Sequence, residues 1–216
     1  MMTRQVGAKT EHYLSNVLPQ MHGWCAEEKA RDLWFSVVEE KARFCVEIGV
    51  FAGRSLFAMG LAVEEQGEGQ VIGIEPWETE ACLKGLQKDG PDAKWWSENV
   101  DLSMIEAAYR KTSAELGLDG VVSVIKERSD DAVKRFQGRV PIDLLHVDGN
   151  HSEEQSCRDV AHFVPLVKAN GLVFFDDVNW ESTKKAQGEL EKMCEKVKVT
   201  ETESGVYGVF RKKESY

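Results

Sequence analysis

Short apolar segments typical of buried strands alternate with helical patterns along most of the chain, and this alternation constrains the fold most. The segments expected to form strands are residues 44–49, 71–75, 121–125, 142–148 and 172–176, with two more near 197 and over 206–210. Apolar residues at helical spacing precede the first strand and recur between the others. Strands separated by helices form a parallel sheet that is covered on both faces. We therefore predict an α/β, doubly wound, mostly parallel seven-stranded sheet, whose last two strands form a C-terminal antiparallel hairpin.

The length of the chain, 216 residues, fits one large domain better than two. We assign residues 23–216 to that domain, with an insertion around 77–100, where the connection is longer than a crossover needs. Residues 1–22 are interpreted as an N-terminal arm or lid. An exchanged arm would belong to a homodimer.

Composition excludes several classes of partner. The net charge of −10 is spread over interleaved acidic and basic residues, whereas nucleic-acid surfaces need clustered Lys and Arg. No stretch approaches the ~20 apolar residues of a membrane span, and the first residues lack the apolar core of a secretory signal. The five cysteines show no CxxC spacing. We expect a cytoplasmic protein with reduced thiols that contacts neither nucleic acid nor membrane.

Two glycines, Gly49 and Gly53, flank the turn after the first strand. Missing side chains let a ligand approach the backbone there, although tight packing is the alternative role for Gly53. Glu75 ends the second strand, where a carboxylate can accept both hydroxyls of a ribose. The turn lacks the G-x-G-x-x-G pattern of NAD-binding proteins. S-adenosylmethionine (SAM), with its cationic sulfonium and amine and no phosphate, suits Glu47 and nearby carboxylates better.

Three carboxylates follow two strands that should be neighbours in the sheet. Asp148 closes the fourth expected strand, and Asp176 and Asp177 close the fifth. Uncompensated, these groups would repel one another, so a shared cation is the simplest explanation. Oxygen ligands favour a hard divalent metal, Mg²⁺ or alternatively Mn²⁺. The structural alternative is that Asp148 and Asp177 bond the amides of their own turns.

The sequence resembles the class I SAM-dependent methyltransferases, and among them a group of small bacterial O-methyltransferases. The likeness runs from about residue 23 to the terminal hairpin and rests on Glu47-Ile-Gly49-Val-Phe-Ala-Gly53-Arg-Ser55, Asp148-Gly-Asn-His151 and Phe175-Asp-Asp177. It implies a Rossmann-like fold in which Glu47 and Gly49 hold the methionine part of SAM and Glu75 the ribose. It also implies that Ser129 with Asp130 holds the adenine. A helix N-cap is the alternative role for Ser129.

The metal-dependent catechol O-methyltransferases are similar at the reacting end. They place one metal-binding Asp after the fourth strand and an Asp-Asp or Asp-Asn pair after the fifth, and this resemblance assigns Asp148, Asp176 and Asp177 to Mg²⁺. Their general base follows the first of these residues by three, at the position of His151, although they have Lys there. An imidazole accepts a hydroxyl proton near neutral pH, and it does so more readily once a metal has acidified that hydroxyl. Alternatively, His151 is a metal ligand or shapes its turn.

The preferred function is therefore SAM-dependent methyl transfer to a hydroxyl of a small metabolite, a sugar or a phenol, with metal assistance. The alternatives are a metal-independent methyltransferase, in which the acids bind an acceptor amine, and a non-catalytic SAM-binding subunit. Loop tryptophans such as Trp180 are candidates for stacking on the acceptor, and Trp95 and Trp96 are a candidate lid. Core or interface packing is the alternative for them. His146, inside a strand, is expected to be structural.

Overall fold

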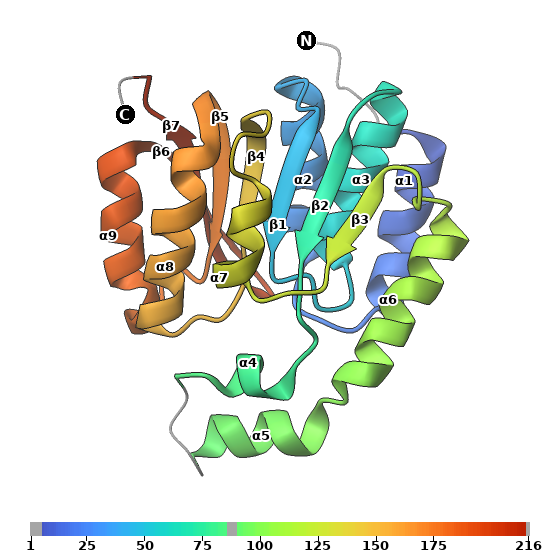
Figure 1. Ribbon diagram of the computed structural model, residues 1–216. Coiled ribbons are helices and arrows are strands. Elements are labelled where there is room, and N and C mark those ends of the chain that lie inside the picture. The colour runs from blue at the N-terminus through green and yellow to red at the C-terminus, as the bar shows by residue number, and fades with distance from the viewer. Residues whose placement is uncertain (1–5, 86–89, 215–216) are drawn as a thin grey trace.

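The computed structural model describes residues 6–85 and 90–214 and shows a seven-stranded sheet in the order β3-β2-β1-β4-β5-β7-β6 (Figure 1). The strands are β1 (Phe44–Ile48), β2 (Gln70–Ile74), β3 (Val122–Ile125), β4 (Ile142–Val147), β5 (Val167–Asp176), β6 (Cys194–Thr202) and β7 (Gly205–Lys212). The first five strands pair in parallel, and β7 pairs antiparallel with both β5 and β6. The predicted doubly wound sheet and its C-terminal hairpin are confirmed.

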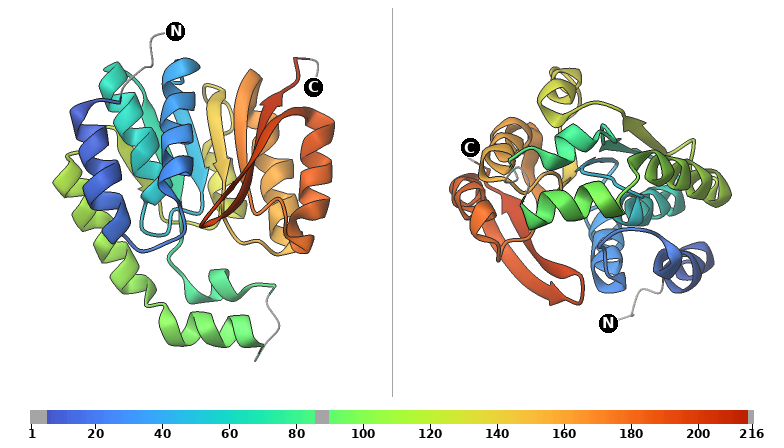
Figure 2. Two further views of the ribbon diagram at one scale, coloured as in Figure 1. Left: turned by 180° about the vertical axis from the view of Figure 1, so that it is seen from behind. Right: turned by 90° about the horizontal axis from the view of Figure 1, so that it is seen from below.

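Helices cover both faces of the sheet, as Figure 1 and the reverse view in Figure 2 show. One face packs against α2 (Glu27–Glu39), α3 (Arg54–Gln66) and α6 (Leu102–Leu116). The other packs against α7 (Ser129–Ala132), α8 (Glu153–Phe163) and α9 (Lys184–Met193). Short single turns are η3 (Val133–Arg135), η4 (Val164–Leu166) and η5 (Glu181–Thr183). Because both faces are covered, all five residues of β1 are buried, Glu47 included, and the strand lacks the apolar–polar alternation of a half-exposed strand.

Helix boundaries follow local signals in the sequence. Helix α3 begins after Gly53 and ends at Gly67, and both glycines have left-handed backbone, with φ of 91° and 79°. Ser152 caps α8, because its hydroxyl accepts from the amide of Gln155 at 3.4 Å. The Gln155 side chain is directed to Ser129 and Asp159 rather than back to the cap, so Ser152 and Gln155 form only half of a capping box.

Two segments lie outside the alternating core. The N-terminal segment forms α1 (Ala8–His12), η1 (Tyr13–Val17) and η2 (Leu18–Gln20), and its side chains Tyr13, Leu14 and Leu18 are buried on the α2 and α3 side. The insertion forms α4 (Thr79–Leu83) and α5 (Pro91–Asn99), which lie beyond the carboxyl ends of the parallel strands (Figure 1).

Residues 1–5 of the predicted arm and 86–89 of the predicted insertion lie outside the described residues. The role of the N-terminal segment as an exchanged arm or lid stays a prediction. Across residues 6–85 and 90–214, every helix is too short or too polar to cross a membrane.

Candidate functional site

A pocket of about 580 Å³ opens at the carboxyl ends of the parallel strands. Small-molecule sites typically have roughly 300–1,000 Å³, and doubly wound folds bind ligands at this edge. Loops after β1 to β5 form its wall, together with residues of the α4 and α5 segment, which lies across this edge in the right view of Figure 2. The predicted residues in its lining are Gly49, Ser55, Glu75, Ser129, Asp148, His151, Asp176 and Asp177.

The glycine turn after β1 is shaped by its contact with the loop after β4. Gly49 has a φ of 86°, and a Cβ atom there would lie 2.0 Å from the carbonyl oxygen of Asp148. A side chain is therefore excluded at this position by backbone that cannot move aside easily. Gly53 opens α3, and its Cβ would meet the Phe57 ring at 2.8 Å. Gly53 lies outside the pocket lining, and its left-handed backbone and contact with Phe57 agree with the packing alternative, while its cofactor role stays a prediction.

The Glu75 carboxylate, just after β2, is held by backbone amides. Its Oε2 accepts from the amides of Val50 at 3.1 Å and Phe51 at 3.0 Å, and its Oε1 accepts from that of Trp77 at 2.9 Å. Burial raises the pKa of Glu75, and the three amide bonds oppose that rise. Carboxylate oxygens have about four acceptor positions in all. The group is therefore fixed in place and can still accept from a ribose.

Glu47 is fully buried within β1, outside the pocket lining. Its Oε1 accepts from the Ser55 hydroxyl and lies 2.9 Å from Nδ1 of His146. Its Oε2 is buried and has no hydrogen-bond partner among the described residues. Burial raises the pKa of Glu47. A buried oxygen without a partner is costly, and an approaching cationic amine would satisfy it.

A second group of buried polar side chains lies in the pocket wall. The hydroxyl of Ser129 donates to Oδ1 of Asp159, and the side-chain amide of Gln155 donates to the same oxygen at 3.2 Å. Burial raises the pKa of Asp159 to about 6. Asp130 lies outside the lining and pairs with an arginine of α8 at 3.0 Å. The N-cap of α7 is the preceding residue, so Ser129 does not have that alternative role.

Two of the three predicted metal ligands, Asp148 and Asp176, lie together with His146 rather than with Asp177, and Lys29 lies between the two carboxylates. Nε2 of His146 lies 3.8 Å from Asp148 Oδ2 and 3.4 Å from Asp176 Oδ1. One ligand atom from each of these residues lies within 4.8 Å of the others, a spacing compatible with a metal. However, Nζ of Lys29 donates to Oδ2 of Asp148 at 2.9 Å and also to Oδ2 of Asp176. The oxygens that a metal would need already bind a cation of the chain itself.

The charged groups of this cluster stabilise one another. Burial alone would lower the pKa of Lys29, but Asp148 and Asp176 raise it well above its usual range. Burial likewise opposes the lowered pKa of Asp148, for which Lys29 is the main cause. Burial and Lys29 would also lower the pKa of His146, but hydrogen bonds to Asp176 and the β1 carboxylate raise it to about 9. The cluster is therefore a network of ion pairs, not a set of uncompensated acids.

His151 contacts the other carboxylate oxygen of Asp148. Its Nε2 lies 3.5 Å from Asp148 Oδ1 and 3.2 Å from Asp177 Oδ2, and its ring packs against Trp180. Burial opposes the raised pKa of His151, which Asp148 and Asp177 cause. Burial raises the pKa of Asp177 to about 6. Asp177 has a φ of 51°, a strained conformation that often occurs at functional sites.

Aromatic side chains form one part of the pocket wall. Trp24, from the segment before α2, packs against Phe51, Trp95 and Trp96 with ring centroids 5.3, 6.1 and 5.8 Å away. Trp24 and Trp95 are each about half exposed although they line the pocket. Trp77 is buried instead, in the core. The placement of Trp95 and Trp96 is compatible with a lid, which stays a prediction.

Lys29 and Asp159 were not among the predicted site residues. Lys29 lies one helical turn before the buried Leu33 of α2, so a lysine on the apolar side of the helix was the available signal. Asp159 similarly precedes the buried Val160 of α8. The sequence pattern indicates that such a group is buried, but its partners lie in distant segments.

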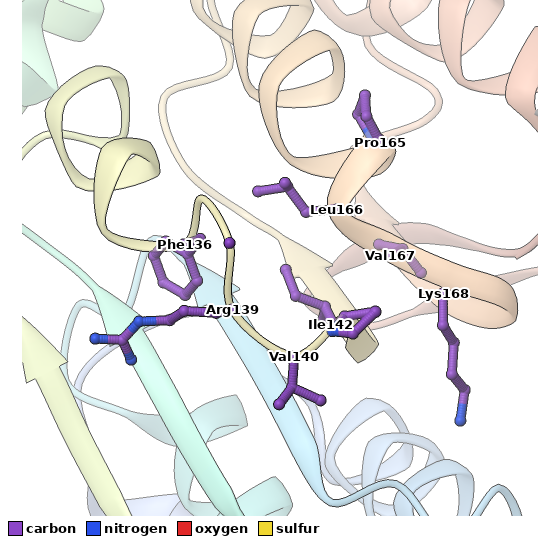
Figure 3. Close-up of a pocket in the computed structure, with 10 residues that line it drawn as sticks. Phe136, Arg139, Val140, Ile142, Pro165, Leu166, Val167 and Lys168 are labelled. Atoms are coloured by element: carbon purple, nitrogen blue, oxygen red, sulfur yellow. The ribbon is translucent and has the colours of Figure 1, made fainter.

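A second cavity, of about 240 Å³, lies at the other end of the strands, where β4 and β5 begin (Figure 3). Apolar side chains such as Phe136, Ile142 and Leu166 line much of it, and its charged residues, Arg139 and Lys168, are basic. Since the acid and base groups described above gather in the larger pocket, we assign the function to that pocket.

Comparison with known proteins agrees with this architecture. Residues 46–178 match the model of a family described as a methyltransferase domain. No curated protein sequence matches the chain significantly. Three similar solved structures come from Streptomyces achromogenes, Klebsiella pneumoniae and Bacillus cereus.

The Streptomyces protein is the O-methyltransferase TomG, involved in tomaymycin synthesis and solved with SAM, at 15% identity and a TM-score of 0.66. The Klebsiella protein, a putative O-methyltransferase, is 12% identical with a TM-score of 0.67. The Bacillus O-methyltransferase, in complex with SAH, is 14% identical with a TM-score of 0.63. Each likeness covers 98% of this chain and 92% of the other. At these identities the likenesses establish a shared fold.

Proposed function

The chain belongs to the methyltransferase-domain family, and from this premise we propose that it transfers a methyl group from SAM to a hydroxyl of a small acceptor. One observation carries the proposal. A single pocket joins the amide-held carboxylate of Glu75 to the pair formed by Asp148 and His151. Two of the similar O-methyltransferase structures contain SAM or SAH, which supports the choice of cofactor.

The residues present fit SAM. Glu75 would accept the ribose hydroxyls, and Ser129 with Asp159 would contact the adenine. Gly49 would line the methionine part, whereas the fully buried Glu47 lies outside the pocket lining and contacts His146. When bound, SAM supplies an electrophilic methyl group and leaves as a neutral thioether.

His151 is the proposed general base. Its Nε2 faces Asp148 and Asp177, which favours a proton on that nitrogen and leaves Nδ1 to accept the hydroxyl proton. The acceptor oxygen then forms its bond to the methyl carbon, and His151 holds the released proton. Asp148 and Asp177 stabilise the resulting imidazolium.

No step is assigned to a divalent metal. The sequence predicts Mg²⁺ on Asp148, Asp176 and Asp177, but Lys29 already binds one oxygen of each of the first two. Asp177 instead contacts His151 at 3.2 Å. This arrangement does not fit a metal without displacing Lys29, so we favour metal-independent transfer to a hydroxyl, in which the acids bind Lys29 and not an acceptor amine.

The proposed acceptor is a small molecule with a hydroxylated ring, either a phenol or a sugar. Trp24 and Trp95 present half-exposed aromatic rings in the pocket, and Trp180 lies beside His151. Aromatic faces pack well against flat rings and against the apolar faces of sugars.

Calorimetric titration with SAM, SAH and NAD tests the cofactor. We expect SAM and SAH to bind with one site per chain and NAD to show no binding, because the glycine turn does not have the dinucleotide pattern. Protein that binds SAM is then incubated with panels of phenols and sugars, and SAH release and the methylated product are measured by mass spectrometry. Failure to bind SAM would refute the proposal. SAM binding without turnover on any acceptor would favour the non-catalytic alternative.

A further inference from the structure

Lys29 has an unusual position for a lysine. Its side chain is 2% exposed, and lysines are almost never buried to this extent unless they are paired. It also lies in the first turn of α2, where the helix dipole disfavours a positive charge. Among the described residues, the carboxylates that bind its Nζ are those of Asp148 and Asp176. Those two ion pairs must therefore offset both costs.

The start of α2 is anchored where it delivers this ammonium group. The amide of Ala26, the N-cap of α2, donates to the Ser204 hydroxyl in the β6–β7 turn at 2.8 Å. Ser204 itself lines the pocket. The position of Lys29 is therefore set by backbone geometry at the pocket edge and not only by a flexible side chain.

Every oxygen of the two carboxylates has a nitrogen nearby. Oδ2 of Asp148 and Oδ2 of Asp176 both bind Lys29. Oδ1 of Asp148 lies 3.5 Å from His151, and Oδ1 of Asp176 lies 3.4 Å from His146. A divalent cation would need these same oxygens, and it would repel the ammonium at close range in a poorly solvated site.

We propose that Lys29 is a built-in replacement for a divalent metal, and that the acceptor is bound through a single hydroxyl instead of by chelation. The ammonium neutralises Asp148 and Asp176 and is a positioning residue, since it holds Asp148 with its other oxygen on His151. A metal that grips two adjacent oxygens would select catechols or vicinal diols. Without one, a phenol or sugar with one accessible hydroxyl is sufficient. Only the acceptor class in this inference rests on the proposed function, whereas the position of Lys29 does not.

Mn²⁺ binding to the full chain, followed by electron paramagnetic resonance, tests the cation position without any turnover. Wild-type protein should bind no Mn²⁺ at this cluster. Lys29→Met, which removes the charge and nearly keeps the length, should gain one Mn²⁺ site. Adding Asp148→Asn to that variant should abolish the gained site. Lys212→Met is the matched control, because Lys212 is also buried but donates to the Val164 carbonyl, and it should gain no site.

The acceptor class is tested with wild-type protein. After treatment with excess EDTA, the turnover rate should stay within about twofold of the untreated rate, well below a tenfold change. Phenols with one hydroxyl should be methylated with kcat/KM similar to that of matched catechols. Strict preference for catechols, together with loss of turnover in EDTA, would overturn the proposal.

Two further results separate the possible failures. Mn²⁺ bound by wild-type protein and lost in Asp148→Asn would overturn the proposal, as would folded, SAM-binding Lys29→Met that gains no Mn²⁺ site. Should Lys29→Met not fold, Lys29→Arg keeps the charge and is expected to bind no Mn²⁺, so Mn²⁺ in that variant or in the wild type decides against the proposal. If no acceptor is methylated, the proposed function fails while the Mn²⁺ result still stands.

Discussion

The two ends of the pocket hold their carboxylates by different means. At the cofactor end, Glu75 is fixed by three backbone amides, each within 25 residues along the chain. At the acceptor end, Asp148 and Asp176 are fixed by one side chain, Lys29, which is 119 and 147 residues away in sequence. Backbone amides remain when neighbouring side chains are replaced, whereas a side-chain partner is lost with one substitution. A single substitution should therefore disturb the carboxylates of the acceptor end more than a side-chain substitution near Glu75 disturbs the cofactor end.

The largest effect is expected from His151→Ala. Loss of a general base lowers kcat by about 10²–10⁴-fold, while SAM affinity should be unchanged because His151 belongs to the acceptor end. Steady-state kinetics and SAM titration measure the two quantities. His12→Ala, an exposed histidine of α1, should change neither. A parallel loss of SAM affinity in His151→Ala, measured without acceptor, would show that His151 also acts at the cofactor end.

Asp159 sharpens the comparison, because it belongs to the cofactor end but is held by side chains. Its pKa is raised from 3.8 to about 6 in the folded protein, so the folded state binds a proton more readily than the unfolded state. The free energy of unfolding therefore falls as pH rises from about 4 to about 6, and the loss persists above that range. A shift of about two units corresponds to up to about 3 kcal/mol.

Asp159→Asn removes the charge and should raise the free energy of unfolding by that order at pH 8 but hardly at pH 4. Urea denaturation at both pH values measures the difference. Asp131→Asn, at an exposed residue of α7, is the control and should show no such gain. Equal stabilisation at both pH values would mean that Asp159 does not carry the pH dependence.

Glu75→Gln tests the amide-held carboxylate. The substitution removes the charge and directs an amide group towards backbone donors, so SAM affinity should fall about tenfold, or about 1.4 kcal/mol. The acceptor KM, measured at saturating SAM, should not change. Glu78→Gln alters an exposed carboxylate on the same loop and should leave SAM affinity intact. An unchanged SAM Kd in Glu75→Gln would remove Glu75 from the cofactor site.

The smallest effect is expected from Trp95→Ala. Loss of one half-exposed aromatic wall residue should raise the acceptor KM about threefold, with kcat nearly unchanged, because stacking contributes only about 0.5–1.5 kcal/mol. Trp95→Phe should retain most of the affinity. A fall in kcat without a change in KM would indicate that Trp95 acts on closure of the site rather than on acceptor binding.

The fold could be predicted because each of its elements carries its own pattern. The continuous burial of β1 and the glycines that bound α3 are local properties of the sequence. Glu75 was found because it ends a strand that its own apolar residues predict, although two of its three amide partners lie in the turn after β1.

The cation at the acceptor end could not be predicted in this way. The acids were expected to need a shared cation, and their position was predicted, but Lys29 reaches them from the opposite end of the chain. Motif spacing also does not say which side of a turn faces the pocket. Gly53 and Asp130 both lie outside the pocket lining, where Gly53 packs on Phe57 and Asp130 pairs with an arginine of α8.

The contact between Gly49 and the Asp148 carbonyl has a thermodynamic consequence. A Cβ atom at Gly49 would lie 2.0 Å from this oxygen, so the two turns are packed too closely for a side chain, and the amide of Asp148 donates to the carbonyl of Ile48. Any movement of the first turn when cofactor binds is thus felt at the residue that orients His151. Linkage then makes the effect reciprocal: by whatever factor cofactor alters acceptor affinity, acceptor alters cofactor affinity equally. One missing methyl group at Gly49 makes the two binding events interdependent.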